Sequence, residues 1–361
     1  MRLEADISVL YLKRNPPRSA SDKGRCLAVS LFLYYTTAMS LRLPFLSLVC
    51  LCTSLLAQTS QPPAPSTISA EEMRAQFTLT RALVTGTVEG ITEYLPVSST
   101  GHMIISDEIM GVKKDKNVII SGVADRKNRP IDQEKAVDDY IVIIQLGAIL
   151  AVVAVFFTRL KNLALGVIRL EKSSLHLATC VMIAFIPAGI VGLLVKDIIA
   201  FDIKIVASAL ILGGLVIFWA EKKLPNHPSN SDEIQQMNFK QSLQVGLCQC
   251  VALIPGTSRS LATILGGRWA GLSNAAATEF SFLVGFVTLT AASLYKMVSL
   301  GPALTQIYPI HYASLGLIIA AITAFISVKW MIGFITRRGL GPFAWYRIIL
   351  GTGILIFELS K

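Results

Sequence analysis

Charged residues are scarce in this sequence. They make up 16% of its 361 residues, whereas a soluble domain carries roughly 25%. The charges form clusters that are separated by long apolar runs, and 53% of all residues are hydrophobic. This scarcity excludes an ordinary soluble enzyme and favours an integral membrane protein.

Two further features are missing. None of the six cysteines has the CxxC spacing of a zinc site, and those in apolar runs are expected to pack as small hydrophobic side chains (Cys180, Cys248 and Cys250). The net charge of +10 is not gathered on one basic face, because the Lys and Arg residues lie between the apolar runs. We therefore expect no nucleic-acid partner, and we interpret these residues as the juxtamembrane signal that sets topology.

Six apolar runs are long enough to cross a bilayer, which takes about 20 residues of helix. Together they predict an all-α polytopic membrane protein. The runs cover about 140–158, 175–195, 203–220, 277–298, 311–333 and 343–359.

The N-terminal part of the chain differs from the rest. Residues 39–57 resemble a secretory signal with an imperfect cleavage site, and an uncleaved additional helix is the alternative. The Pro/Ser-rich stretch 58–68 is typical of a linker, and Ser69 and Glu72 fit a capping box that opens the first helix of the body. We therefore predict an N-terminal extension over 1–74 and a membrane domain over 75–361.

The membrane domain repeats one plan in two halves, about 75–220 and 239–361. In each half, an apolar segment interrupted by Gly and Pro precedes three of the long runs; these segments are about 77–110 and 240–270. Such a segment is a candidate for a re-entrant helical hairpin, which enters and leaves the membrane on one side. Because three spans separate the two hairpins, we predict an inverted-topology repeat in which the hairpin tips meet at a polar cavity.

The charge distribution favours one orientation. Three connections between the predicted spans share one face and are rich in Lys and Arg, which favours that face as cytoplasmic and the N-terminus as external. These connections are 159–174, 221–240 and 335–342. The polar segment 113–137 is predicted to form a surface loop on the other face, although it carries basic residues of its own.

The first interrupted segment contains two glutamates, Glu89 and Glu93. Because they are four residues apart, they share one face of a helix. Two adjacent carboxylates at membrane depth repel each other unless a cation or a shared proton offsets their charge. A divalent metal ion bound together with substrate phosphate would do so, which makes the pair candidate metal ligands; a pair of satisfied structural carboxylates is the alternative.

The same segment continues into a candidate phosphate site. Pro96 ends the helix, and Ser98 and Ser99 are placed to cap a new one. The start of a helix offers free N–H groups and a partial positive charge, which suit phosphate. His102 is expected on the same face as both serines, where it could act as nucleophile, general acid or general base; a structural histidine is the alternative.

The second interrupted segment reads PGTSRSLAT from Pro255. Hydroxyl side chains again follow a break, and Arg259 lies in the first turn of an otherwise apolar region. A buried Arg needs an anion, and its fork of N–H groups fits phosphate oxygens. We predict phosphate binding by Ser258, Arg259, Ser260 and Thr263; pairing of the Arg with one of the two glutamates for structure alone is the alternative.

Facing each other, the two segments hold the groups that phosphoryl transfer requires. The motifs ExxxE with PVSSTGH, and PGxSRSxxT about 160 residues later, resemble the signature motifs of the undecaprenyl-diphosphate phosphatase (bacitracin-resistance) family. Gln145 and Glu279 also fit the pattern of that family, and the similarity covers roughly 75–360.

The resemblance implies a hydrolase of the bacterial plasma (inner) membrane that removes one phosphate from undecaprenyl diphosphate. It implies a divalent cation, Mg²⁺ or Ca²⁺, a site that faces the periplasm, and roles in peptidoglycan and cell-wall synthesis, cell shape and bacitracin resistance. The partners are then the lipid substrate and the bilayer. The catalytic residues carried over are Glu89, Glu93, Ser98, Ser99, His102 and Arg259, with Glu89 and Glu93 also as metal ligands.

A transporter that flips the polyprenyl phosphate is the alternative function, because inverted repeats with broken helices are also a transporter plan. The carboxylate pair favours chemistry, since an anion site needs the Arg and the helix ends but not two glutamates. The nucleophile stays open among Ser98, Ser99, His102 and a metal-activated water. The sequence also leaves open whether the protein is a monomer or a homodimer.

Overall fold

The computed structural model describes residues 66–195, 202–224 and 233–360. The signal-like segment over 39–57 and most of the linker over 58–68 lie outside the described residues. The chain divides into two compact units, of which the first, Met1–Gln61 with Ile190–Ile199, is described only from Ile190 to Val195. The account below therefore concerns the second unit, Pro62–Gly189 with Ala200–Lys361.

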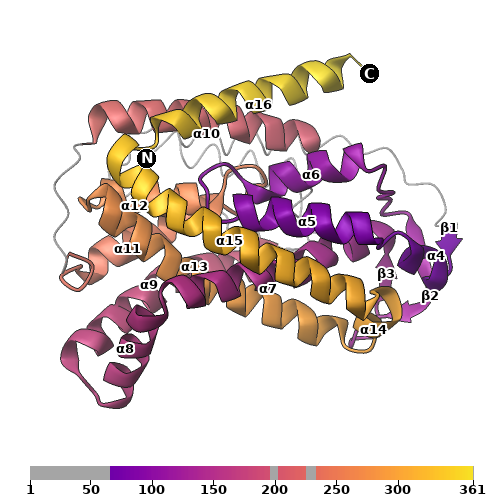
Figure 1. Ribbon diagram of the computed structural model, residues 1–361, viewed down its shortest axis with the longest axis horizontal. Helices are drawn as coiled ribbons and strands as arrows, with labels where there is room; N and C mark the ends of the chain where they lie inside the picture. Colours follow the sequence, from indigo (N-terminus) through magenta and orange to yellow (C-terminus); the bar gives the residue numbers. More distant parts are fainter. Residues whose placement is uncertain (1–65, 196–201, 225–232, 361) are drawn as a thin grey trace, which may run out of the picture. The chain divides into compact units, whose positions relative to one another are not determined.

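The described chain is mainly helical (Figure 1). Among the described residues, six helices are long and apolar enough to cross a membrane, which confirms the six predicted spans and the polytopic helical class. They are α7 (Gln133–Val155), α9 (Lys172–Val195), α10 (Ile203–Lys223), α13 (Asn274–Leu300), α15 (Ile310–Arg338) and α16 (Gly341–Leu359).

The first of these helices begins earlier than the hydropathy pattern predicts. Asp132 caps α7, and its carboxylate accepts a hydrogen bond from the backbone N–H of Lys135 at 2.7 Å. The first two turns are therefore polar helix that extends beyond the apolar run.

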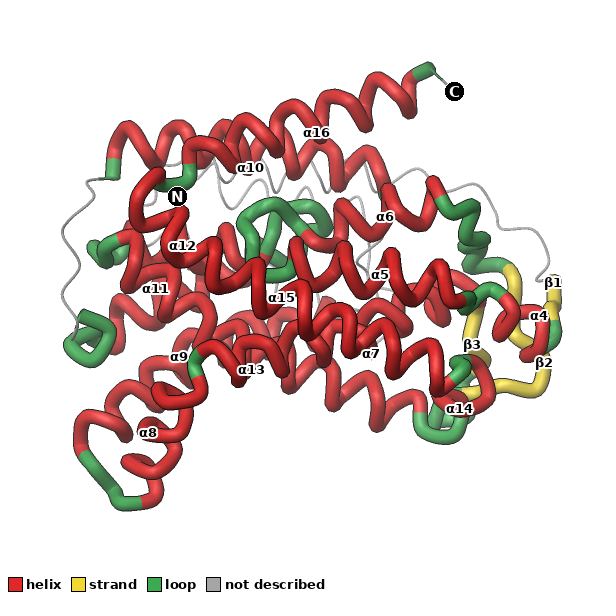
Figure 2. Tube along the Cα trace, in the orientation of Figure 1, coloured by secondary structure: helices red, strands yellow, loops and turns green. Residues whose placement is uncertain are grey.

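Two pairs of shorter helices correspond to the two interrupted segments. The first pair is α5 (Leu79–Thr92) and α6 (Ser99–Ile109), and the second is α11 (Phe239–Val251) and α12 (Arg259–Trp269). With 11 to 14 residues, each is too short to span a bilayer alone. The loop within each pair lies among the helices (Figure 2).

A small three-stranded sheet lies at one end of the helices (Figure 1). Strand β1 (Ser66–Ile68) pairs in parallel with β2 (Val118–Ala124), which pairs antiparallel with β3 (Pro130–Asp132). The prediction of a surface loop over 113–137 was therefore incomplete, because two short strands form inside it. The last residues of the predicted linker form the third strand.

Two short helices, α4 (Ala70–Ala75) and α14 (Ala303–Ile307), pack beside this sheet, and we call the whole region the sheet end. Its apolar core includes Met73, Phe77 and Tyr140. The predicted capping box is confirmed at the start of α4, because Ser69 and Glu72 each accept a hydrogen bond from the other's backbone N–H.

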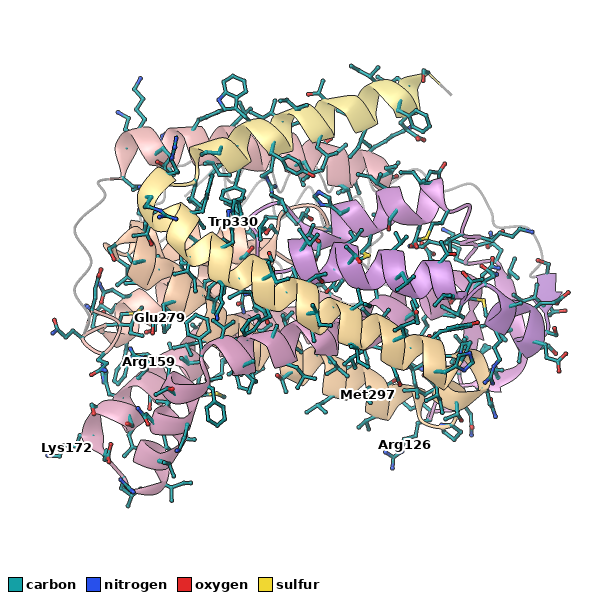
Figure 3. All side chains as sticks on the ribbon, in the orientation of Figure 1. Arg126, Arg159, Lys172, Glu279, Met297 and Trp330 are labelled. Atoms are coloured by element: carbon teal, nitrogen blue, oxygen red, sulfur yellow. The ribbon has the colours of Figure 1, made fainter. Side chains whose placement is uncertain are left out.

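At the opposite end of α7, helix α8 (Phe157–Ile168) leads into α9. Arg159 of α8 forms an ion pair with Glu279 of α13 at 3.1 Å, and Figure 3 shows the two side chains together. Glu279, which fits the family pattern in sequence, is thus part of this junction between helices.

Glycine allows helix α15 to pack closely against α5 and α7. A Cβ at Gly147 of α7 would come within 2.1 Å of the backbone oxygen of Leu317, and one at Gly86 of α5 within 2.4 Å of the backbone oxygen of Gly316. Small residues are needed where membrane helices approach this closely.

This packing predicts that Gly147→Ala destabilises the protein. The added methyl group would force α7 and α15 apart, at a cost of about 1–3 kcal/mol. We expect the midpoint of thermal unfolding in detergent to fall by roughly 3–8 °C. The matched control is Gly353→Ala in α16, where a Cβ meets no atom within 4 Å. Equal midpoints for the two variants would contradict the close helix contact.

Candidate active site

The two helix breaks have the same local geometry. Ser98 caps α6 and Ser258 caps α12, and their φ angles are 72° and 75°, a left-handed conformation that is uncommon for serine. Each serine hydroxyl oxygen accepts a hydrogen bond from a backbone N–H in the first turn of its helix, at 3.3 Å in both cases. The predicted capping is therefore confirmed at Ser98, and Ser99 becomes the first residue of α6.

An ion pair joins the two breaks. One oxygen of Glu93 accepts a hydrogen bond from the guanidinium of Arg259 at 3.1 Å, and the other accepts one from the hydroxyl of Ser99 at 2.7 Å. Arg259 also donates to the backbone oxygen of Ser281 in α13 at 3.1 Å. The structure thus brings together three of the predicted site residues from opposite halves of the chain.

Glu89 lies one turn before Glu93 and is fully buried. Within the described residues, neither of its carboxylate oxygens makes a hydrogen bond. Polar side chains close enough to act on it include Glu93, Gln145 and Arg259. Gln145 and Arg259 compensate this fully buried carboxylate only in part, so the position is suited to a proton or a bound cation.

The hydroxyl groups of the second motif support the first break. Ser260 donates to the backbone oxygen of Leu95 at 2.8 Å, and Ser258 donates to the same oxygen at 3.4 Å. Thr263 is hydrogen bonded to the hydroxyl of Ser281 at 2.6 Å. All three hydroxyls are therefore engaged within the protein.

His102 makes its hydrogen bonds elsewhere. Its Nδ1 lies 2.7 Å from the backbone oxygen of Ser98, and its Nε2 lies 2.7 Å from the hydroxyl of Tyr346 in α16. The planes of the two rings are parallel, and their centroids are 5.6 Å apart. His102 is thus adjacent to the break but is not hydrogen bonded to Glu93, Ser99 or Arg259.

Arg347 of α16 is a buried residue that the sequence patterns did not single out. It is fully buried, and its guanidinium donates to the backbone oxygens of Pro96 at 3.1 Å and of Gly256 at 3.0 Å. It also donates to the oxygens of Ala209 and Leu210 in α10. One side chain therefore binds both helix breaks. The sequence feature that could have identified it is a single Arg inside the predicted span 343–359.

Two glycines leave room for the arginines of this site. A Cβ at Gly285 of α13 would lie 2.0 Å from Nη1 of Arg259, and one at Gly213 of α10 would lie 2.2 Å from Nη2 of Arg347. Any other residue at these positions would displace a guanidinium.

The donor set fits a hard divalent cation that is shared with phosphate. The part of the chain that the structure describes holds no group of three or more His, Cys, Asp or Glu residues that could bind a metal alone. Mg²⁺ commonly uses one or two carboxylates and completes its shell with substrate phosphate and water. Glu89 and Glu93 supply two carboxylates, and the unpartnered oxygens of Glu89 are available for such a bond.

A family model and individual relatives point to the same protein family. A family model described as "Bacitracin resistance protein BacA" matches residues 82–353. The undecaprenyl-diphosphatase of Acinetobacter baumannii strain ATCC 17978 is 42% identical over 291 residues, which are 79% of this chain and 98% of the relative. Undecaprenyl-diphosphatase 1 of Chromobacterium violaceum is 42% identical over 280 residues, which are 77% of this chain and 95% of the relative.

The position of Arg347 predicts that Arg347→Met destabilises the protein severely. Methionine cannot donate to the carbonyl groups of Pro96 and Gly256 in the two breaks, and each buried carbonyl left without a partner costs about 1–3 kcal/mol. We expect the midpoint of thermal unfolding in detergent to fall by roughly 5–10 °C. Arg337→Met is the control, because this exposed Arg donates to no group of the described chain except the carbonyl of Gly333 in its own helix. An unchanged midpoint for Arg347→Met would show that the breaks do not depend on it.

Proposed function

The chain belongs to the bacitracin resistance protein BacA family, and on that basis we propose that it is an undecaprenyl-diphosphatase. It is a multi-pass membrane hydrolase that removes the terminal phosphate of undecaprenyl diphosphate. Its product is the carrier lipid that cell-wall synthesis uses, and the activity confers bacitracin resistance. The observation in this chain that best supports the proposal is the contact of Glu93 with both Arg259 and Ser99, next to the unpartnered carboxylate of Glu89.

Transport of the polyprenyl phosphate is not favoured. An anion site for transport would need Arg259 and the two helix starts, but it would have no use for two buried carboxylates. The relatives at 42% identity are named as diphosphatases.

In this proposal the Glu93–Arg259 pair opens when substrate enters. Arg259 moves from the carboxylate to the phosphate oxygens, and the N–H groups at the starts of α6 and α12 orient the diphosphate. Glu93, released from Arg259, takes the proton of the Ser99 hydroxyl, which already lies 2.7 Å away.

The chemistry is then a two-step transfer. The Ser99 oxygen forms a bond to the terminal phosphorus, and the bond from phosphorus to the bridging oxygen breaks, so that the lipid monophosphate leaves. Water then hydrolyses the phosphoserine and releases orthophosphate. Glu89 and Glu93 would hold Mg²⁺ or Ca²⁺, and the charge of the ion would offset negative charge on the phosphates.

We further propose that α5–α6 and α11–α12 are re-entrant hairpins of an inverted repeat in a bacterial inner membrane. The matching serine caps and helix lengths of the two pairs support this arrangement. The described parts of the basic connections lie at the end opposite the sheet (Figure 1), so the sheet end would face the periplasm, and substrate would enter from that side.

Phosphate release from a long-chain polyprenyl diphosphate tests the function. We expect metal-dependent release by the purified protein, suppressed by a chelator, and a loss of about 10²-fold or more in Glu93→Gln and in Arg259→Ala, because each removes charge stabilisation of the transition state. Glu71→Gln and Arg337→Ala are the charge-matched controls, since both residues are exposed and lie outside the site.

The decisive negative result would be a folded, monodisperse wild type that releases no phosphate with any of several divalent metals. That outcome would overturn the enzymatic proposal and place lipid-phosphate transport first.

A further inference from the structure

One edge of the Arg259 guanidinium is only half occupied in the resting protein. Nη1 donates to the backbone oxygen of Ser281, and Nη2 donates to Glu93, each at 3.1 Å. Nε is buried and makes no hydrogen bond within the described residues. Nε and Nη2 together carry the parallel N–H groups that bind an oxyanion side-on. Release of Glu93 therefore frees this whole edge for phosphate.

The same release also removes one of the two hydrogen bonds that orient the guanidinium. Only the bond to the carbonyl group of Ser281 would then remain of the pair. Side-on binding of phosphate requires a planar fork in a fixed orientation, and a long Arg side chain on one hydrogen bond is free to turn. A further contact that leaves the N–H groups of Nε and Nη2 free would keep Arg259 in place.

The ring of Tyr94 provides such a contact. Tyr94 follows Glu93 in the first break and is fully buried, and the centroid of its ring lies 5.2 Å from Cζ of Arg259. The face of an aromatic ring attracts a cation within about 6 Å, and the attraction is stronger where water is excluded. Unlike a carboxylate, the ring has no net charge, so it does not neutralise the charge that binds phosphate.

Helix α13 fixes both the ring and the guanidinium. The ring of Phe282 packs edge-on against the ring of Tyr94, with centroids 5.4 Å apart and an interplanar angle of 80°. Ser281, the preceding residue, binds Nη1 of Arg259, and the lack of a side chain at Gly285 leaves room for the same nitrogen. One stretch of α13 therefore sets the position of the ring relative to the guanidinium.

The hydroxyl group of Tyr94 has no comparable role. It is buried and has no hydrogen-bond partner among the described residues. Removing a polar group that makes no hydrogen bond leaves no partner unsatisfied, so phenylalanine can replace Tyr94 without loss. The contribution of the ring can therefore be separated from that of the hydroxyl group by substitution.

We propose that Tyr94 is a positioning residue of the reaction, whose ring holds the guanidinium of Arg259 in place when Glu93 releases it to the phosphates. The inference rests on the proposed function, because the reaction is what separates Glu93 from Arg259. Tyr94 acts through Arg259 and does not itself bind the phosphates or the attacking oxygen.

The value of kcat/KM for phosphate release from a long-chain polyprenyl diphosphate tests the proposal. Tyr94→Leu should lower it about tenfold, since a cation–π contact shielded from water contributes about this much. Tyr94→Phe should stay within about twofold of the wild type, because it keeps the ring. Tyr94→Met serves in place of Tyr94→Leu if the latter does not purify as monodisperse protein.

Phe156→Leu is the matched control for lost aromatic packing. The ring of Phe156 also contacts Phe282, with centroids 5.5 Å apart, and in the described chain it makes no cation–π contact with Arg259. This variant should keep the kcat/KM of the wild type within about twofold.

A second comparison distinguishes positioning from a general structural role. In the Arg259→Ala background, Tyr94→Leu should cause no further loss of kcat/KM, because the group that it positions is absent. A further tenfold loss in that background would overturn the proposal. Equal losses in Tyr94→Phe and Tyr94→Leu would also overturn it, since the hydroxyl group would then be the active part, as would full activity in Tyr94→Leu.

Binding of a radiolabelled long-chain polyprenyl monophosphate separates this proposal from the proposed function. A wild type that releases no phosphate, but whose binding weakens about tenfold in Tyr94→Leu and not in Tyr94→Phe, would refute the phosphatase and leave the role of Tyr94 intact. Equal binding by an inactive wild type and Tyr94→Leu would refute both.

Discussion

The rest of the site depends on the hydrogen bonds that the guanidinium of Arg347 donates to backbone carbonyl groups. Non-helical backbone inside a membrane must have its polar groups satisfied within the protein, and here two helix breaks meet. Arg347 donates to a carbonyl group in each break and to two more in α10, and within the described residues it forms no ion pair with a carboxylate. Its charge therefore stabilises buried carbonyl dipoles, and a residue from a third part of the chain holds the two breaks together.

This arrangement brings chemistry from both halves of the chain into one place. Ser258 and Ser260 bind the backbone of the first break, and Arg259 between them reaches Glu93. In the absence of substrate, the ion pair keeps the positive and negative charges of the site from being buried alone. In the proposed reaction the same pair separates to admit phosphate, so the binding energy of the substrate must replace the interaction that stabilises the resting protein.

The active site and the sheet end are joined by one helix, α5. Its buried polar residues occupy successive turns from Arg81 to Glu93, while Gly86 and Gly90 face α15. The glycine side of the helix provides close packing, which fixes the position of the polar side. One face of α5 can therefore pack closely against α15 while another face carries the buried polar residues. Residues four apart share a face of a helix, and those between them do not.

The sequence by itself determined the six spans, since length and hydropathy suffice for a helix in lipid, and it located both breaks through Pro, Gly and the capping serines. It also predicted that Glu93 and Arg259 need partners, because both are charged residues in apolar segments. Only the tertiary structure decided which partners these are. It directed His102 to Tyr346, placed Arg347 between the breaks, and formed strands inside a polar segment, because each depends on residues far apart in the chain.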